Sequence, residues 1–334
     1  MQDPSSDPKV LLLSEADVRA VLSMDDLIAA METALADFSA RKVTQPLRTV
    51  LEAGEQHAFY GVMPAYLPRT PALGTKLVTV FGSNAVVGLP THLALIVLLD
   101  PNTGALRALL DGRYITEART AAVSAVSVDH LAREDARTLA IIGSGVQARS
   151  HLDAISRVRT LADVRIWSRS LAGREAFMRD MQPHSTARLS MADSAEAAVR
   201  DADVIVLATS SRDPVLHRDW VRDGTHICAV GACRPTEREM DAALVARADL
   251  FVDSREGALK ESGDVVLAIR DGAITAAHIR AEMGEVVSGG APGRQSPARV
   301  TIFKSLGMAV EDVAAAHLAY VRARAQGRGS EWRF

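Results

Sequence analysis

A glycine-rich turn near the middle of the chain carries the clearest chemistry. Residues 142–148 read Ile-Gly-Ser-Gly-Val-Gln-Ala, a G-x-G-x-x-A pattern between a short apolar run and a helix-like segment. Gly143 permits a tight bend, Gly145 lets a pyrophosphate approach the backbone, and the closing alanine allows close packing of helix and strand. Val146 and Gln147 lie at the helix N-terminus, whose N–H groups attract anions. The pattern predicts a dinucleotide site, although an ordinary glycine-rich turn has the same composition.

The residues after the next strand-like run indicate which dinucleotide binds. Sites for NAD usually carry an acidic residue roughly 20 residues beyond the glycine turn, where it binds the ribose hydroxyls. This chain has Ser168, Arg169 and Ser170 at that point, and no acid. A guanidinium between two hydroxyls suits a 2′-phosphate, because it can bind the phosphate bidentately. We therefore expect NADPH (NADP) in preference to NADH, the alternative being that Arg169 is a solvated loop residue.

Apolar runs and helix-like segments alternate around this turn. The strand-like runs are residues 139–142, 164–167, 204–208, 226–230 and 250–252. This alternation predicts a parallel, doubly wound sheet. Ala208, Thr209 and Ser210 end the run at 204–208, at the edge where a dinucleotide crosses such a sheet.

The first third of the chain has a different pattern. Ser14 and Ser23 are each followed three residues later by an aspartate, which predicts two helix N-termini, so we expect the chain to open with a short helix and a long one. Strand-like runs separated by glycine- and proline-rich turns between residues 47 and 111 predict an antiparallel sheet. Helices are expected over about 116–131 and, at the end of the chain, over about 302–325.

Composition places few limits on function but excludes several classes. The 334 residues are enough for two domains, and the net charge of −3 gives no indication of a nucleic-acid partner. Cys228 and Cys233 are too few for a disulfide framework. The acidic start lacks the features of a signal peptide, and the longest apolar run, Leu93–Leu99, is too short for a membrane span. We expect a cytoplasmic protein without a metal site.

Several segments outside the glycine turn share a family pattern. They are residues 45–48 (Gln-Pro-Leu-Arg), 61–64 (Gly-Val-Met-Pro), 74–78 (Gly-Thr-Lys-Leu-Val), 115–122 (Ile-Thr-Glu-Ala-Arg-Thr-Ala-Ala), 258–264 (Ala-Leu-Lys-Glu-Ser-Gly-Asp) and 303–307 (Phe-Lys-Ser-Leu-Gly). With the glycine turn, and in one collinear order over nearly the whole chain, they strongly resemble the ornithine cyclodeaminase/mu-crystallin family. Such an order is far more specific than the glycine turn alone.

The resemblance implies an α/β fold of two parts. A Rossmann domain that binds NADP, residues 129–304, is inserted into a discontinuous α+β domain for substrate binding and dimerisation, residues 1–128 and 305–334. It also implies a homodimer that acts in amino-acid metabolism.

The resemblance further implies that Arg48, Lys76 and Arg119 bind the carboxylate of an imino or amino acid beside the nicotinamide. Physical chemistry agrees, because guanidinium groups can fork onto carboxylate oxygens. Burial of Lys76 on an apolar strand can lower its pKa, so that it could donate a proton or polarise an imine. Taken singly, Arg48 could be a loop cation, Arg119 a residue on a helix surface, and Lys76 part of the polar face of a strand.

Other cofactor contacts follow from the family pattern. Thr91 and His92 resemble a pair on the cofactor side, and Arg119 with Thr120 is expected to contact the cofactor as well. Val230 and Leu306 are expected to pack on the nicotinamide. His92, Val230 and Leu306 could equally be core residues.

Two positions depart from the ornithine cyclodeaminases. Cys233 replaces an aspartate assigned to catalysis, and Gly61 replaces a glutamate that holds the amine of the substrate. Hydride transfer needs no nucleophile, so Cys233 is interpreted as a compact pocket residue. The Cys-Arg-Pro run at 233–235 is closer to the mu-crystallin branch, which reduces cyclic ketimines.

The leading hypothesis is therefore an NADPH-dependent reductase of cyclic 2-imino acids, such as pyrroline- or piperideine-2-carboxylate. Enzyme alternatives are a true ornithine cyclodeaminase, an alanine-type amino-acid dehydrogenase and an acyclic imino-acid reductase. The alternative of another class is a non-catalytic, crystallin-like protein that binds NADPH and a ligand, since mu-crystallins also bind thyroid hormone or serve as lens proteins.

Overall fold

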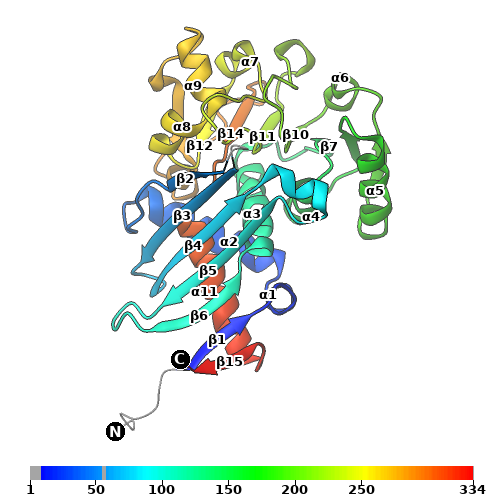
Figure 1. Cartoon of the computed structure of the whole chain (residues 1–334). Helices are drawn as coiled ribbons and strands as arrows, with labels where there is room; N and C mark the ends of the chain where they lie inside the picture. The colour runs from blue at the N-terminus through cyan, green and yellow to red at the C-terminus, as the bar shows by residue number, and fades with distance from the viewer. Residues whose placement is uncertain (1–8, 55–57, 334) are drawn as a thin grey trace. The chain divides into compact units, whose positions relative to one another are not determined.

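The computed structural model describes residues 9–54 and 58–333, and the chain divides into two compact units (Figure 1). Unit 1 comprises residues 1–119 and 308–334, and unit 2 comprises residues 120–307. The sequence placed these boundaries at 128/129 and 304/305. Helix α3 (Arg113–Leu131) contains both the predicted boundary at 128/129 and the boundary between the two units at 119/120. The functional names given to the two domains stay predictions.

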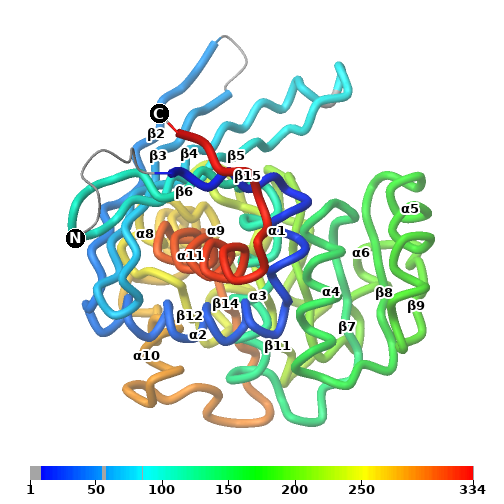
Figure 2. Tube along the Cα trace, turned by 90° about the horizontal axis from the view of Figure 1, so that it is seen from below, coloured from blue at the N-terminus to red at the C-terminus, as the bar shows by residue number. Residues whose placement is uncertain are grey.

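Among the described residues of unit 1, seven strands form one sheet in the order β15-β1-β6-β5-β4-β3-β2. Their bounds are β1 Lys9–Leu13, β2 Thr49–Ala53, β3 Ala58–Leu67, β4 Ala72–Val80, β5 His92–Leu99, β6 Leu106–Asp111 and β15 Ser330–Arg333. Strands β2 to β6 pair antiparallel, as the turn-rich sequence predicted. Strand β1 pairs with β6 in parallel and with β15 antiparallel (Figure 2).

The prediction that the chain opens with two helices was wrong at its start. The described chain begins with β1, whose apolar residues Val10 to Leu13 pair between two other strands, a long-range contact that local patterns do not show. Helices α1 (Glu15–Val21) and α2 (Met24–Ser39) follow it. Their N-caps are confirmed, because the Ser14 and Ser23 side chains accept hydrogen bonds from the backbone N–H groups of Asp17 and Asp26.

Helix α11 (Ala309–Ala325) organises the covered face of this sheet. It packs against β3, β4 and β5 and lies beside α2 (Figures 1 and 2). Because side chains alternate between the two faces of a strand, every second residue of β4 points towards α11. Lys76 is one of these buried positions. The short 3₁₀ helix η1 (Gly82–Val87) connects β4 to β5.

The terminal helix starts later than the expected residue 302. Residues 301–304 form strand β14 (Thr301–Lys304), which pairs with a parallel strand on each side. A short apolar run of this kind is compatible with either a buried strand or a helix. Gly307 then adopts a left-handed conformation, φ +79°, that favours glycine and separates the strand from α11.

Within the described residues of unit 2, eight parallel strands form a second sheet, in the order β13-β12-β14-β11-β10-β7-β8-β9. Their remaining bounds are β7 Thr138–Ile142, β8 Asp163–Trp167, β9 Arg188–Met191, β10 Val204–Leu207, β11 His226–Ala229, β12 Asp249–Val252 and β13 Ile279–Glu282. The order β9-β8-β7-β10-β11 reverses direction between β7 and β10, as in a Rossmann fold, where ligands bind beyond the carboxyl ends of the strands. The predicted doubly wound sheet is confirmed.

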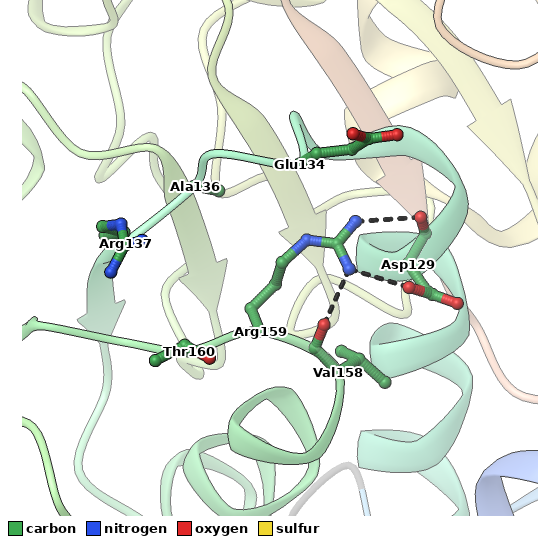
Figure 3. A pocket seen from close by; sticks show the side chains of 7 residues that line it. All are labelled: Asp129, Glu134, Ala136, Arg137, Val158, Arg159 and Thr160. Atoms are coloured by element: carbon green, nitrogen blue, oxygen red, sulfur yellow. Dashed lines mark hydrogen bonds and ion pairs between the residues drawn. The ribbon is translucent and has the colours of Figure 1, made fainter.

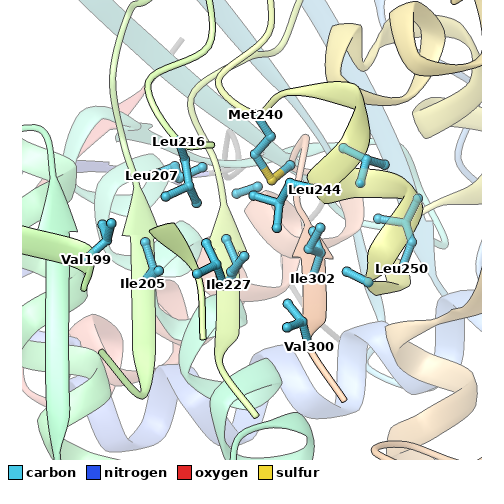
Figure 4. Packing of buried hydrophobic residues seen from close by; sticks show 14 of the residues in the cluster. Val199, Ile205, Leu207, Leu216, Ile227, Met240, Leu244, Leu250, Val300 and Ile302 are labelled. Atoms are coloured by element: carbon cyan, nitrogen blue, oxygen red, sulfur yellow. The ribbon is translucent and has the colours of Figure 1, made fainter. Parts of the chain in front are cut away.

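Helices connect these strands and bury both faces of the sheet. They are α4 Val146–Val158, α5 Leu171–Met181, α6 Ala195–Val199, α7 Ala242–Arg247, α8 Arg255–Glu261, α9 Gly263–Arg270 and α10 Met283–Val287, with short 3₁₀ turns η2 Gln182–His184, η3 Arg218–Trp220 and η4 Ala276–His278. Figure 4 shows the packing on one face, where Ile205, Ile227 and Ile302 of three adjacent strands meet Leu244 of α7. This buried core packs the strands whose carboxyl ends lead into the turns described below.

Candidate active site

A buried group of charges lies in unit 1 between β4, α3 and α11. The Asp312 carboxylate bridges two cations: one oxygen lies 2.5 Å from Lys76 Nζ, and the other accepts a 2.9 Å hydrogen bond from Arg119 Nε. Arg119 Nη1 donates to Glu311 at 2.8 Å, and the Glu311 carboxylate also accepts from the Met308 N–H. Lys76 is 2% exposed and Arg119 is 4% exposed. The alternatives of a polar strand face for Lys76 and a helix surface for Arg119 are therefore excluded.

Burial sets the protonation behaviour of this group. Removal from water lowers the pKa of Lys76 to about 8, against the opposing effect of the Asp312 charge and reinforced by Arg119 and Arg48. The same cations lower the pKa of Asp312, although burial alone would raise it. A lysine with a pKa of about 8 is mostly protonated at neutral pH and gives up its proton more readily than an ordinary lysine.

The structure places Arg48 and His92 near Lys76 as well. Arg48 is half-buried in the loop before β2, and its charge acts on Lys76. His92 opens β5, opposite Val80 of β4. Burial, and after it the charges of Lys76 and Arg119, lower the pKa of His92 to about 4, so that its imidazole is neutral at neutral pH. Thr91, next to it, is exposed and accepts a hydrogen bond from the Phe81 N–H through its carbonyl.

Little space for a side chain is available at Gly61. Gly61 lies on β3 opposite Val78, on the face of the sheet that carries Lys76. A Cβ atom at Gly61 would lie 3.0 Å from Val78 Cγ1, so a larger residue would require Val78 to move. The cyclodeaminases are expected to carry a glutamate at this position. In this chain, the Val78 side chain limits the space that is available for a side chain there.

In unit 2, the backbone of the glycine turn is bent tightly at Gly143 and open at Gly145. Gly143 has φ +122°, and a Cβ there would overlap the carbonyl of Ala208 at the end of β10. A Cβ at Gly145 would meet no atom within 4 Å, so the backbone there is open to a close approach. Gly145 caps α4 without a side-chain hydrogen bond, and Val146 is exposed beside it. The amide oxygen of Gln147 is buried, with no hydrogen-bond partner among the described residues.

The predicted ribose-side segment follows β8 directly. The Ser168 hydroxyl lies 2.9 Å from that of Ser144 in the glycine turn and donates to the Ser170 carbonyl. The Ser170 hydroxyl in turn caps α5 by accepting from the Gly173 N–H. Arg169 is exposed at the tip, and its side chain has no ion pair within the described part of the chain. The two serines therefore fix the loop and leave the guanidinium at its outer end.

Beyond the ends of β10 and β11, one buried carboxylate joins two turns. Glu239 accepts from the Thr209 N–H at 2.8 Å and its hydroxyl at 2.6 Å, and from the N–H groups of Gly231 and Ala232 at 2.8 and 3.2 Å. Burial raises the pKa of Glu239. Ser210 is exposed next to Thr209. This carboxylate therefore holds two turns together. The turn at Thr209 is predicted to contact the dinucleotide, and the turn after Val230 is predicted to contact the nicotinamide.

The second of these turns carries Val230 and Cys233. Val230 is buried, whereas Cys233 is exposed and its thiol donates to the Val230 carbonyl at 3.4 Å. Lys304 and Asp264 form a buried ion pair in the same unit, with Lys304 Nζ 3.1 Å from Asp264 Oδ2. Burial alone would lower the pKa of Lys304, but the charges of Asp264, Cys233 and Glu239 together raise it.

A second buried carboxylate fixes the turn that contains Leu306. Asp253 accepts from the N–H groups of Leu306 and Gly307 at 2.5 and 2.8 Å. Leu306 is buried behind β14. Thr120, also predicted to contact the cofactor, is buried in α3.

A surface pocket of 320 Å³ lies at the opposite edge of the unit 2 sheet, near the amino ends of β7 and β8 (Figure 3). Its main cation, Arg159, donates to the Asp129 carboxylate and to the carbonyls of Val158, Val128 and Arg133. Because its donors are used by the protein itself, and ligands of such sheets bind at the carboxyl ends, this pocket is not a candidate site. Within residues 9–54 and 58–333, no cluster of acids, histidines and cysteines could hold a metal, and no helix is long and apolar enough to cross a bilayer.

Sequence reasoning missed four acidic residues of these sites. Glu311 and Asp312 lie in an apolar, alanine-rich helix, and two adjacent acids in such a run are a recognisable indication of buried partners. Asp253 and Glu239 gave no such indication. Glu239 lies in a charged run, Glu-Arg-Glu at 237–239, that is typical of an exposed loop.

The parallel sheet, its reversal at β7 and β10 and the open glycine turn define a Rossmann-type α/β protein. The profile of the ornithine cyclodeaminase/mu-crystallin family matches residues 9–327. The chain belongs to this family, as its sequence motifs predicted.

Three relatives cover almost the whole chain. The ketimine reductase mu-crystallin of Mus musculus is 44% identical over 297 residues, which are 88% of this chain and 91% of that protein. The solved Δ1-pyrroline-2-carboxylate reductase of Thermococcus litoralis, in complex with NADH and L-proline, is 39% identical with a TM-score of 0.94, over 96% of this chain and 99% of that chain. An archaeal alanine dehydrogenase, solved as a dimer with bound NAD, is 33% identical with a TM-score of 0.93, over 98% of this chain and 100% of that chain.

Proposed function

We propose that this protein is an NADPH-dependent reductase of cyclic 2-imino acids, the ketimine class that includes Δ1-pyrroline- and Δ1-piperideine-2-carboxylate. The observation that carries the proposal is the buried Lys76–Asp312–Arg119 group, which combines a proton donor with fixed cations. Relatives named as a ketimine reductase and a pyrroline-2-carboxylate reductase support the same substrate class.

In this proposal, unit 1 binds the carboxylate of the substrate and protonates its imine nitrogen. Its carboxylate binds to Arg48 and to the edge of Arg119, whose other nitrogens are held by Asp312 and Glu311. Reduction of a C=N bond is easiest when its nitrogen is protonated, because the carbon is then more electrophilic. Lys76, with a pKa of about 8, supplies that proton or stabilises the charge on nitrogen. His92 is neutral and can accept or donate a hydrogen bond without adding charge.

The cofactor fits unit 2. The open N-terminus of α4 at Gly145 binds the pyrophosphate, while Val230 and Leu306, held by their turns, pack on the nicotinamide. When bound, the nicotinamide supplies the hydride. Arg169 with Ser168 and Ser170 favours a 2′-phosphate, because the loop offers a guanidinium and no acid. The relatives with NADH and NAD support a nicotinamide cofactor in general, so the preference for NADPH rests on this loop alone.

Cyclisation of ornithine is the main alternative, and the residues favour reduction. Deamination of a flexible diamine requires a carboxylate to anchor the second amine and a base. Gly61 has no side chain, and Val78 narrows the space beside it. Cys233 cannot act as a carboxylate base. A cyclic imino acid requires neither group, since its ring already holds the nitrogen in place.

We also propose that the protein is a cytoplasmic homodimer formed through the face of the unit 1 sheet opposite Lys76. Leu51, Leu93 and Leu95 are 56%, 40% and 40% exposed there, on the face opposite Lys76. Apolar patches of this kind mark protein interfaces. Light scattering should give twice the 35.7 kDa of one chain, and Leu95→Asp should shift the protein towards monomer. A monomeric wild-type protein would contradict this assignment.

The proposal is tested by steady-state assays with a panel of substrates. NADPH oxidation should be fastest with pyrroline- or piperideine-2-carboxylate and much slower with pyruvate or other 2-oxo acids plus ammonia, and ornithine should give little or no proline. Fast turnover of 2-oxo acids with ammonia would favour the dehydrogenase or acyclic reductase alternatives. Binding of NADPH without turnover of any of these compounds would favour a crystallin-like binding protein.

A further inference from the structure

Asp312 holds an unusual position among the described residues of unit 1, because it contacts two of the three proposed substrate cations, Lys76 and Arg119, from inside the protein. Its two oxygens divide between Lys76 and Arg119, and it is fully buried in the first turn of α11. Its neighbour Glu311 binds Arg119 from the same helix, and the Met308 N–H. Both acids therefore pair with Arg119, but only Asp312 also pairs with Lys76.

We propose that Asp312 is a positioning residue that acts through Lys76: its carboxylate keeps the Lys76 side chain in place as a protonated ammonium group, ready to serve the nitrogen of the imine. This inference rests on the proposed function. It adds a division of labour between the two adjacent acids, in which Asp312 controls the proton donor and Glu311 fixes the orientation of Arg119.

The charges around Lys76 show why an acid is required. Burial, Arg119 and Arg48 all disfavour the ammonium form, and Asp312 is the carboxylate that opposes them. His92 on β5 is neutral at neutral pH and does not replace that charge. Without Asp312, a buried lysine beside two guanidinium groups would lose its proton at a lower pH. A neutral amine could not protonate the imine nitrogen.

The direct test observes the Lys76 side chain itself. The sequence has only five lysines (Lys9, Lys42, Lys76, Lys260 and Lys304), so lysine labelled with ¹³C and ¹⁵N gives a simple NMR spectrum. The Lys76 signal is assigned by its loss in Lys76→Met. In the wild-type protein it should titrate near pH 8. In Asp312→Asn the midpoint should fall by about one pH unit or more, because an opposite charge at this distance shifts a pKa by about 1–3 units.

The matched control is Glu311→Gln. It removes the negative charge of the adjacent acid, which pairs with Arg119 but not with Lys76. Its Lys76 midpoint should stay close to that of the wild type. An unchanged midpoint in Asp312→Asn, or an equal shift in both variants, would overturn the proposal. So would a wild-type Lys76 that is already neutral at pH 7, a result that does not depend on whether Asp312→Asn folds.

Turnover supplies a second measurement. If Asp312 acts through Lys76, the double variant Lys76→Met/Asp312→Asn should have the kcat of Lys76→Met within about twofold. A further loss of tenfold or more would show that Asp312 acts independently and would overturn the proposal. The NMR titration needs no substrate, so it remains informative even if the wild-type protein fails to reduce cyclic imines. That failure would count against the proposed function alone.

Discussion

At the scale of single residues, Arg169 decides the cofactor in this account. Arg169→Asp should lower the affinity for NADPH by about tenfold or more, because one charge-assisted contact to the 2′-phosphate contributes about 1.5–3 kcal/mol. The affinity for NADH should change little or rise, since an acid at this point can bind the ribose hydroxyls.

The control for this change is Arg179→Asp, an equal change of charge at an exposed position in the last turn of α5. Fluorescence titration of both variants and of the wild type with NADPH and NADH gives the comparison. A wild-type protein that binds the two cofactors equally well would show that the loop after β8 was misinterpreted.

Among the residues of the proposed substrate site, Arg48 has the simplest proposed role, which is to bind the carboxylate of the substrate. Arg48→Ala should raise KM for the imino acid by about tenfold or more and leave the affinity for NADPH unchanged, because the lost interaction is to the carboxylate of the substrate. Arg69→Ala, at an exposed arginine of the same unit that pairs with Asp37, is the control. Steady-state kinetics that do not distinguish the two variants would remove Arg48 from the site.

The sequence predicted the cations of the candidate site but not the acids that pair with them. The cations could be found because the family motifs mark them, and the structure brings Lys76 and Arg119 together at one carboxylate. Their acidic partners Asp312 and Glu311 lie about 190 residues further along the chain than Arg119. Ion pairs over such a separation leave no periodic pattern, so both acids were missed, although two adjacent acids in an apolar helix are an indication of buried partners.

At the scale of elements, the two glycines of the turn before α4 should behave differently. Gly143→Ala should lower the free energy of unfolding by about 1–3 kcal/mol, because φ +122° and the Ala208 carbonyl both exclude a side chain. Gly145→Ala should leave stability nearly unchanged but weaken NADPH binding, since a methyl group there fills open space over the turn. Urea unfolding and cofactor titration measure the two effects. Equal effects on stability would contradict this division.

Elements with strong local patterns were predicted well, and those defined by distant partners were not. The strands β7, β8, β10 and β11 and the caps Ser14 and Ser23 follow from apolar runs and side-chain chemistry. Strand β1 was missed and β14 was assigned to a helix. Both are short segments whose conformation depends on pairing with strands far away in the sequence. Local sequence cannot distinguish a buried strand from a buried helix of the same length.

At the scale of the whole molecule, the chain combines two chemistries in two units. Unit 1 contains the buried Lys76–Asp312–Arg119 group, for which we propose substrate binding and proton donation. Unit 2 contains the open glycine turn, for which we propose dinucleotide binding. The discontinuous organisation was predicted through the family resemblance, whereas composition alone indicated only two domains. The boundary inside α3 could not be predicted, because a continuous helix carries no linker or change of composition.

The central claim is that hydride passes from the nicotinamide to the C=N carbon of a cyclic 2-imino acid. The most direct measurement supplies NADPH deuterated at C4 together with piperideine-2-carboxylate and follows the product by NMR and mass spectrometry. The account predicts one deuterium at C2 of the resulting pipecolate when the label occupies the transferred position, with one NADPH oxidised for each product formed. Release of ammonia and formation of unlabelled proline from ornithine, without net oxidation of NADPH, would contradict it and establish a cyclodeaminase instead.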